Sequence, residues 1–404
     1  NPSFTASGYS ELMPFVNGEA GGGLVANFGA DSSFAGNKTP QGNQDSNDIG
    51  DFYYAPPTGF LALCTQNLPD ATVIPSEHFN TVTWTGNGST QSIAVGFQPD
   101  FTWIKNRGNT LEHVLTDSVR GVTKRLESNT TDAEVTQVSD LQSFDTDGFT
   151  VGNQNRVNQS AVALAAWNWK AGGTASSNTN GTITSSVSAN VEAGFSIISW
   201  VGNATNAATV GHGLSVSPEM VIVKNRDRTS NWHVGGDGVG TDNQYLNLNT
   251  TSAIDSASTG FQGFTSTVFQ LGTDTDWNAN SEDLIAYCFH SVVGHSRVGS
   301  YIGNGNADGP FVHCGFKPKF VMLKRSSEVG AWMMFDTERS TYNVMNDKLE
   351  ANSLGAEDPD TSWNIDFLSN GFKLRSSHIY MNSGANTHIF LAFAENPFKH
   401  TNAR

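Results

Sequence analysis

The chain has 404 residues, of which 37% are hydrophobic and only 15% are charged, and its formal net charge is −16. This acidic balance argues against nucleic acid and anionic membrane surfaces as partners of the whole molecule. Aromatic residues reach 10% and glycine is abundant at 41 residues, which favours a folded chain of many short strands joined by turns. No apolar run is long enough to cross a membrane, so membrane insertion is not expected.

The first 75 residues differ in character from the remainder. They open on NPSFTASGYS, with neither Met nor a signal peptide, as expected for a piece of a longer polypeptide. The string YAPPTGFLALCTQNLP at 54–69 resembles the closing strand of a SPRY domain, a concanavalin-like β-sandwich. The resemblance implies that residues 1–75 are the C-terminal part of such a sandwich.

From residue 76 onward, one sequence pattern occurs three times. The strand-like phrase DFTWIKNRGN at 100–109 returns as EMVIVKNRDR at 219–228 and KFVMLKRSSE at 319–328. An aromatic residue followed by x-Gly-Asn precedes each phrase, at Trp84, Trp200 and Tyr301. A Gly-Phe pair and a closing apolar run follow it each time, so we expect three homologous modules. The expected boundaries are module 1 at 76–173, a linker at 174–186, module 2 at 187–294 and module 3 at 295–404.

The strand pattern of the modules predicts their fold class. Runs such as SIISWV and FVMLK are four to eight residues long, rich in β-branched and aromatic residues, and bounded by Gly, Asn, Asp and Pro. The sequence therefore predicts an all-β chain of serial, jelly-roll-like β-sandwich modules. Because each module is long enough to enclose its own core, a cut near residue 180 is expected to leave two folded pieces.

The recurring residues are expected to belong to the framework. In the first phrase, Phe101, Trp103 and Lys105 should face one side of a strand and Ile104 the other. The repeated lysines at 105, 224 and 324 are expected to pair with the aspartates at 117, 237 and 336. The aromatic residues at 84, 200 and 301 should be mostly buried, each on its own module. Cys64, Cys288 and Cys314 lack ligand spacing and are expected to be buried hydrophobes.

The set of motifs resembles the distal part of phage tail-fibre proteins. A SPRY-like segment followed by WTGNG and IKNR repeats is similar to such fibres, and the closing FLSNGFKLRSS…FLAFAENPFKHTNAR is similar to their C-terminus, especially in marine phages. The resemblance implies a virion-attached, extracellular, homotrimeric host-recognition protein that contacts other virion tail proteins. It supplies no site residue that can be carried over.

No catalytic or metal motif emerges from the sequence. The stretch Asp145-Thr-Asp-Gly148 is similar to the start of a calcium loop, but position twelve is Arg156, where that loop needs a bidentate Glu. A turn before a strand is the preferred interpretation. No nucleophile stands with its base, and the histidines are scattered. We expect no enzyme activity, no metal and no cofactor.

The loops after the Gly-Phe strands are the candidate binding regions, because their chemistry changes while the framework repeats. They read GNQNRVNQS, GTDTDWNANSE and SSHIYMNSGAN. Trp277, His378 and Tyr380 are aromatic residues in these polar stretches, a combination typical of sugar sites. The alternative is that they fill a contact between subunits.

These observations predict a non-enzymatic tail-fibre segment that adsorbs to a host-surface receptor, most simply a glycan. One alternative is a structural virion protein, such as a head fibre or capsid decoration, without a receptor of its own. The other is a polysaccharide depolymerase.

Overall fold

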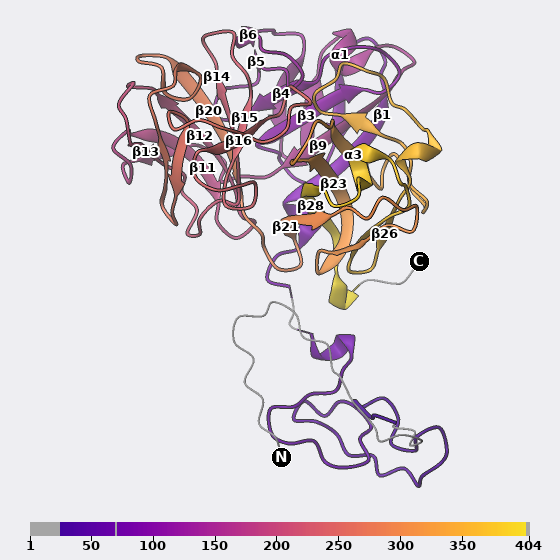
Figure 1. Cartoon of the computed structure of the whole chain (residues 1–404). Coiled ribbons are helices and arrows are strands. Elements are labelled where there is room, and N and C mark those ends of the chain that lie inside the picture. The colour runs from indigo at the N-terminus through magenta and orange to yellow at the C-terminus, as the bar shows by residue number, and fades with distance from the viewer. Residues whose placement is uncertain (1–24, 69–70, 401–404) are drawn as a thin grey trace. The chain divides into compact units, whose positions relative to one another are not determined.

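The computed structural model of the chain describes residues 25–68 and 71–400 (Figure 1). The chain divides into two compact units, Asn1–Asp70 and Ala71–Arg404. The first 24 residues of the SPRY-like prediction lie outside the described part.

Turns, rather than paired strands, organise residues 25–68. The Asp45 carboxylate accepts hydrogen bonds from the backbone N–H groups of Asn47, Ile49 and Ala62. The segment expected to be a closing strand forms turns and the 3-10 helix η1 (Thr65–Asn67). A strand needs a hydrogen-bonding neighbour, and within 25–68 the isolated bridge between Asn43 and Phe52 is the only strand pairing.

In residues 71–400, one strand order recurs in three large sheets. The first sheet is β1 (Phe79–Thr85), β9 (Ala163–Trp169), β3 (Phe101–Asn106) and β4 (Val114–Asp117). The second is β10 (Ser176–Asn178), β11 (Ser185–Asn190), β12 (Phe195–Val201), β20 (Asp283–Phe289), β14 (Met220–Asn225), β15 (His233–Gly235), β16 (Gln244–Asn247) and β17 (Asp255–Ser256). The third is β21 (Ser296–Ile302), β28 (Thr387–Pro397), β23 (Phe316–Arg325), β24 (Trp332–Asp336) and β25 (Leu349–Glu350).

A three-stranded antiparallel sheet accompanies each large sheet. These are β2 (Gln91–Ala94), β8 (Gly148–Val151) and β7 (Leu141–Asp145); β13 (Ala208–Gly211), β19 (Val268–Leu271) and β18 (Phe261–Phe264); and β22 (Phe311–His313), β27 (Gly371–Leu374) and β26 (Ile365–Leu368). The remaining elements are β5 (Lys124–Arg125), β6 (Val135–Thr136), η2 (Pro75–Glu77), η3 (Thr361–Trp363), η4 (Phe398–His400) and the short helices α1 (Asn155–Asn158), α2 (Thr275–Asn278) and α3 (Ile379–Asn382). The chain is all-β, with pairs of packed antiparallel sheets that we call the first, second and third sandwiches.

The central strands of each large sheet are buried on both faces. In β3, Ile104 points into the core of the first sandwich, whereas Phe101 and Trp103 point the other way. That second face joins one cluster that also contains Phe195 and Tyr287 of the second sandwich and side chains of the third, such as Phe393. The Phe101 and Tyr287 rings stack with their centroids 4.2 Å apart. The central strands β3 and β14 are buried along their whole length, polar residues such as Thr102 and Lys105 included, because both faces are covered.

The three sandwiches therefore share a core, in addition to the core that each encloses. Three clusters are confined to one sandwich each, and a fourth draws on all three. Figure 1 shows the purple, salmon and orange parts of the chain packed beside one another, each with its own large sheet. The expectation of serial modules is corrected here, because residues 71–404 form one compact unit.

Equivalent contacts join the sandwiches in cyclic order. At the first–second seam, Lys224 Nζ donates to the Thr131 carbonyl at 3.1 Å. At the second–third seam, Lys324 Nζ donates to Thr251 at 3.1 Å, and at the third–first seam Lys105 Nζ donates to Leu354 at 3.2 Å. One backbone hydrogen bond of 2.8 Å also crosses each seam. The N–H groups of Glu134, Ile254 and Glu357 donate to the carbonyls of Arg226, Ser326 and Arg107, respectively. The seams thus close a ring within one chain.

The lysines do not pair with the aspartates expected from the sequence. Their hydrogen-bond partners are mainly backbone carbonyls; for Lys105 these are Asn106, Asn109 and Leu111 in addition to Leu354. Burial lowers the pKa of Lys105 and Lys224 to about 8, and that of Lys324 to about 7. The strand-end cation is therefore a latch between sandwiches and not a cap on a carboxylate.

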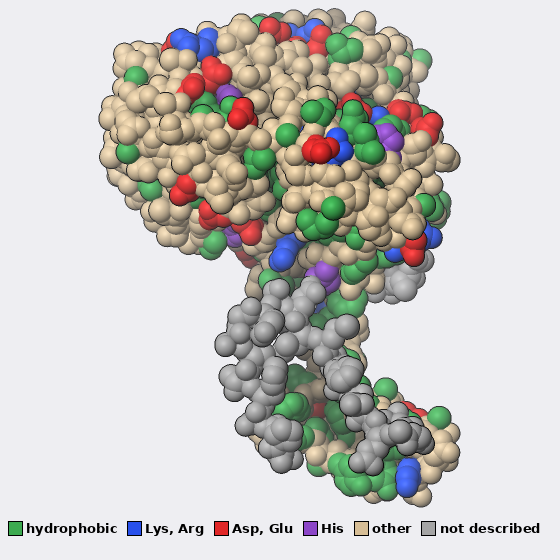
Figure 2. Space-filling view, in the orientation of Figure 1, with side chains coloured by type: hydrophobic (Ala, Val, Ile, Leu, Met, Phe, Trp, Pro, Cys, Tyr) green, Lys and Arg blue, Asp and Glu red, His purple; other side chains and the backbone are tan. Residues whose placement is uncertain are grey.

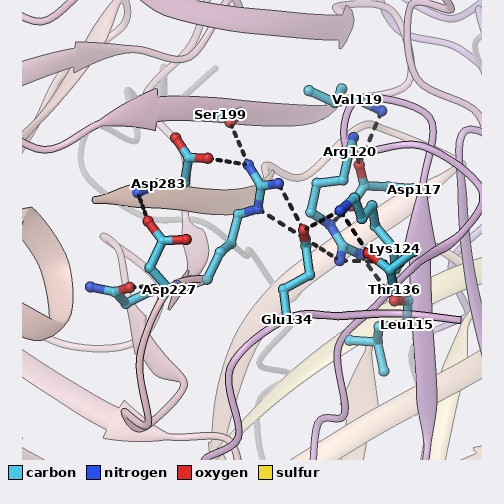
Figure 3. A network of polar contacts seen from close by, with 12 residues as sticks. Leu115, Asp117, Val119, Arg120, Lys124, Glu134, Thr136, Ser199, Asp227 and Asp283 are labelled. Atoms are coloured by element: carbon cyan, nitrogen blue, oxygen red, sulfur yellow. Dashed lines mark hydrogen bonds and ion pairs between the residues drawn. The ribbon is translucent and has the colours of Figure 1, made fainter. Parts of the chain in front are cut away.

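Two seams also contain buried ion clusters. At the first–second seam, Glu134 lies between Arg226 and Arg120, which in turn binds Asp117 (Figure 3). The Tyr287 hydroxyl of the second sandwich donates to Asp117 at 2.8 Å.

At the third–first seam, Glu357 lies between Arg107 and Arg339. Arg339 binds Asp336, and Trp167 of the first sandwich donates to this carboxylate at 3.0 Å. The charged residues of the two clusters are of the same types and make equivalent contacts, whereas the aromatic donor is Tyr287 in one and Trp167 in the other.

The second–third seam has no such cluster, because uncharged residues stand at the equivalent positions. The positions of Asp, Arg and Glu are held by Gly236, Val239 and Ile254, as the shared backbone hydrogen bonds show. The partner position of Tyr287 and Trp167 is Leu391, which lies at the same register of its sheet. This seam is held by apolar contact, the lysine latch and a hydrogen bond from Trp332 Nε1 to the Asn247 carbonyl at 2.9 Å.

Two further predictions concern cysteine and membranes. Cys288 and Cys314 are buried free thiols as predicted, whereas Cys64 is exposed. In the described part of the chain, no helix has the length and apolar character needed to cross a membrane.

Candidate binding surface

A single helical turn occupies the same place in each sandwich and ends on a buried asparagine. Asn158 ends α1, and its side-chain amide donates to the carbonyls of Ser89 and Gly152, while its Oδ1 accepts from the N–H of Asn87. Asn278 and Asn382 make the corresponding contacts in the other sandwiches. The Asn of the repeated aromatic-x-Gly-Asn motif is therefore one half of a clasp on the helical turn.

The glycine of the same motif is required by close packing. A Cβ added at Gly86 would lie 2.2 Å from the Gln159 carbonyl oxygen. At Gly202 and Gly303 the corresponding contacts, with the carbonyls of Ala279 and Ser383, are also 2.2 Å. The motif recurs because the backbone of the turn leaves no room for a side chain there.

The motif aromatics lie on their own sandwiches, as predicted. Trp200 and Tyr301 are buried, and they pack edge-on against Phe269 and Phe372. Trp84 is only half-buried, at the partly exposed end of β1. The prediction is confirmed for Trp200 and Tyr301 and is too strong for Trp84.

Trp277 lies in the core of the second sandwich and not at its surface. Its indole is 2% exposed, stacks on His233 with centroids 4.2 Å apart, and meets Phe261 edge-on. It precedes the clasp asparagine, a position held by Val157 and Met381 in the other sandwiches, and both are fully buried. Trp277 fills a hole in the framework, so it offers no ring face to a ligand.

His378 and Tyr380 lie together at the surface of the third sandwich. The His378 side chain caps α3 by accepting from the Tyr380 N–H, and the two rings are 5.2 Å apart. His378 also packs on Trp363, at 4.2 Å. We call Trp363, His378 and Tyr380 the aromatic surface. Figure 2 shows hydrophobic, charged and histidine side chains together on the lobe that carries α3 in Figure 1.

Cations flank the aromatic surface at both ends. Lys348 Nζ lies 3.9 Å above the Trp363 ring, and the Arg325 guanidinium lies 5.8 Å from the Tyr380 ring centre. Burial, followed by the charges of these two cations, lowers the pKa of His378 and so favours its uncharged imidazole. The half-buried His378 and Tyr380 leave part of each ring open to solvent.

Sequence reasoning missed Trp363 and Lys348. Trp363 lies in the polar stretch DPDTSWNID, so the criterion that selected Tyr380 could have selected it. No sequence pattern marked Lys348, because its position above the Trp363 indole depends on its β-bridge to Asp358.

The same framework position carries different chemistry in each sandwich. The second residue of the helical turn is Arg156 in α1, Asp276 in α2 and Tyr380 in α3. Arg156 pairs with Glu112 and Glu127. The His233 hydrogen bond to Asp276 lowers the pKa of that carboxyl group. A fixed scaffold thus presents a basic, an acidic and an aromatic side chain at equivalent places.

A cleft of about 890 Å³ lies beside residues 171–175, next to Asp100 and Glu192. No aromatic residue lines it. The Asp100 carboxylate is already bonded to the Ser118 hydroxyl and the N–H groups of Ala171 and Gly173. In residues 25–68 and 71–400, no group of three or more His, Cys, Asp or Glu side chains could hold a metal ion.

The fold and surface define the class: an all-β protein in which one chain closes a ring of three sandwiches. The chain belongs to a family described as a domain of unknown function, DUF7483, whose model matches residues 74–397. The match spans the ring almost completely. Neither the curated proteins nor the solved structures include a match to this chain.

Proposed function

We propose that the chain is a non-enzymatic, extracellular segment of a phage tail fibre that adsorbs to a glycan on the host surface. The observation that carries this proposal is the helical-turn position, where a rigid framework holds Arg156, Asp276 and Tyr380 in equivalent places. Binding scaffolds combine a constant framework with changing side chains at its rim.

The aromatic surface is the proposed glycan contact. Sugar rings pack their C–H faces on aromatic rings, while polar neighbours bond the hydroxyls. His378 and Tyr380 supply partly open rings, and Trp363 supports them from below. The acidic net charge favours a protein that remains soluble outside the cell.

The fibre is proposed to be a homotrimer attached to other tail proteins of the virion. The homotrimer rests on the resemblance to tail fibres alone. The ring of three sandwiches lies within one chain, so it is not evidence for an assembly of three chains. Weak glycan sites repeated by symmetry gain about 10²–10⁴ in avidity. Light scattering of the full chain tests it, and a stable monomer at micromolar concentration would contradict the trimer.

A glycan array probed with the full chain tests the function. Tyr380→Ala is expected to weaken binding about fivefold or more, the equivalent of about 1 kcal/mol for one aromatic contact. The matched control is Tyr342→Ala, an exposed tyrosine of the third sandwich outside the aromatic surface, which should leave glycan affinity unchanged. Absence of glycan binding by the unmodified chain would favour a structural virion protein, and release of oligosaccharide would indicate a depolymerase.

A further inference from the structure

A small cleft lies beside the aromatic surface in the third sandwich. Its volume is about 170 Å³, and it is lined by Lys348, Glu350, Ser353, Gly355, Ala356 and Asp358, together with Leu349. At about 30 Å³ per water, it holds about six waters. That is room for one sugar ring and not for a chain of them.

We infer that this side cleft is a subsite for one uncharged sugar residue, continuous with the aromatic surface. The inference rests on the proposed function and deepens it, because it names the class of sugar. The two places are directly connected: Trp363 Nε1 donates to Asp358 at 2.9 Å, and Lys348 covers the same indole. A glycan that touches Tyr380 and His378 can thus extend toward the cleft.

The charges of the cleft select against acidic sugars. Lys348 Nζ lies 2.7 Å from Glu350 and 3.4 Å from Asp358, so one ammonium serves two carboxylates. The Asp358 side chain is 46% exposed, and the remaining lone pairs of its carboxylate oxygens can only accept hydrogen bonds. Sugar hydroxyls donate to carboxylates in strong charge-assisted bonds, whereas a uronate would add a third negative charge.

The loop that forms the cleft is fixed by the ring. Residues 351–357 connect β25 to the bridge at Asp358. The Ser128 hydroxyl donates to the Ala351 carbonyl, Lys105 donates to Leu354, and two arginines bind Glu357. A cleft whose walls are already ordered loses little conformational entropy when a ligand binds.

Filling the cleft tests the inference. The unmodified chain is titrated with neutral oligosaccharides selected on the array and with their uronate counterparts. We expect the neutral sugars to bind at least tenfold more tightly. Ala356→Trp places an indole at the exposed rim of the cleft and should weaken neutral-sugar binding at least tenfold. The matched control is Ala253→Trp, at the equivalent loop position of the second sandwich, which should leave the affinity unchanged.

A second variant pair tests the charge argument without changing volume. Asp358→Asn keeps an acceptor for Trp363 but removes one negative charge, and it should narrow the preference for neutral over acidic sugars. The matched control is Asp255→Asn, at the equivalent position in β17, which should leave this preference unchanged. If Tyr380→Ala weakens binding but Ala356→Trp does not, the subsite is wrong and the proposed function stands. A preference for uronates would also overturn the subsite, and binding of no glycan would overturn both.

Discussion

Glu357→Gln is the sharpest perturbation of the ring, because one carboxylate at the third–first seam serves two arginines. Its Oε1 lies 2.6 Å from Arg107 Nη2, and its Oε2 lies 2.9 Å from Arg339 Nη1. The Arg107 Nε contacts both oxygens, at 3.1 and 3.0 Å. The substitution keeps the size of the side chain but removes its charge.

The expected cost follows from burial. Breaking a buried ion pair costs about 3–5 kcal/mol. The Arg107 and Glu357 side chains are 19% and 14% exposed, so water screens part of that interaction. Arg339 keeps Asp336 and two backbone carbonyls as partners. We therefore expect Glu357→Gln to lower the free energy of unfolding by about 2–3 kcal/mol.

Urea unfolding followed by tryptophan fluorescence measures this loss. Glu338→Gln is the matched control, because Glu338 is 41% exposed and pairs only with Lys319 among the described residues. It should change stability by less than about 1 kcal/mol. A loss for Glu357→Gln no larger than that of the control would show that the cluster does not hold the seam.

Three other outcomes are expected. Gly303→Ala should lower the free energy of unfolding, measured in urea, by more than ~2 kcal/mol. Gly263→Ala should not, because its added Cβ meets nothing closer than 3.9 Å, and equal effects would refute the steric account of the motif. Trp277→Ala should cost about 3–5 kcal/mol and leave the affinity of the folded protein for glycan unchanged, so selective loss of binding would restore Trp277 as a contact. Burial lowers the pKa of His295 to about 3 and of His388 to about 4, so the unfolded chain takes up protons first as the pH falls below about 6.5; stability should decrease from there toward pH 4, and a flat profile between pH 7 and 4.5 would contradict this.

Much of the framework could be predicted from sequence because it depends on local periodicity. Alternation along β3 places Phe101 and Trp103 on one face and Ile104 on the other, as the two core clusters confirm. The burial of Trp200 and Tyr301 followed from their recurrence at one place in the pattern. The Asp145–Gly148 stretch is the predicted turn, joining β7 to β8.

The ring could not be predicted in the same way, because periodicity shows that a face is apolar but not what covers it. The apolar run 162–169 is a landmark of the repeat in the sequence, and only the three-dimensional packing shows that one face of β9 meets the other sandwiches. The latches of Lys105, Lys224 and Lys324 join residues far apart in the chain, which no local pattern encodes.

The candidate site could also be predicted only in part from the sequence. Trp277 and Tyr380 both lie in polar loops, but they hold adjacent positions of equivalent helical turns. One position points into the core and the other toward solvent, so a shift of one residue separates a framework residue from a surface residue. Composition alone cannot make that distinction.

Cleavage of the full chain at an engineered protease site beside Asn180 tests the closed ring most directly. The exposed turn there joins β10 to β11. Because the sandwiches share a core and three seams, the two fragments should elute together from a size-exclusion column under native conditions and unfold in a single transition. Fragments that separate and unfold independently, each with its own cooperative transition, would contradict the ring and restore the serial arrangement.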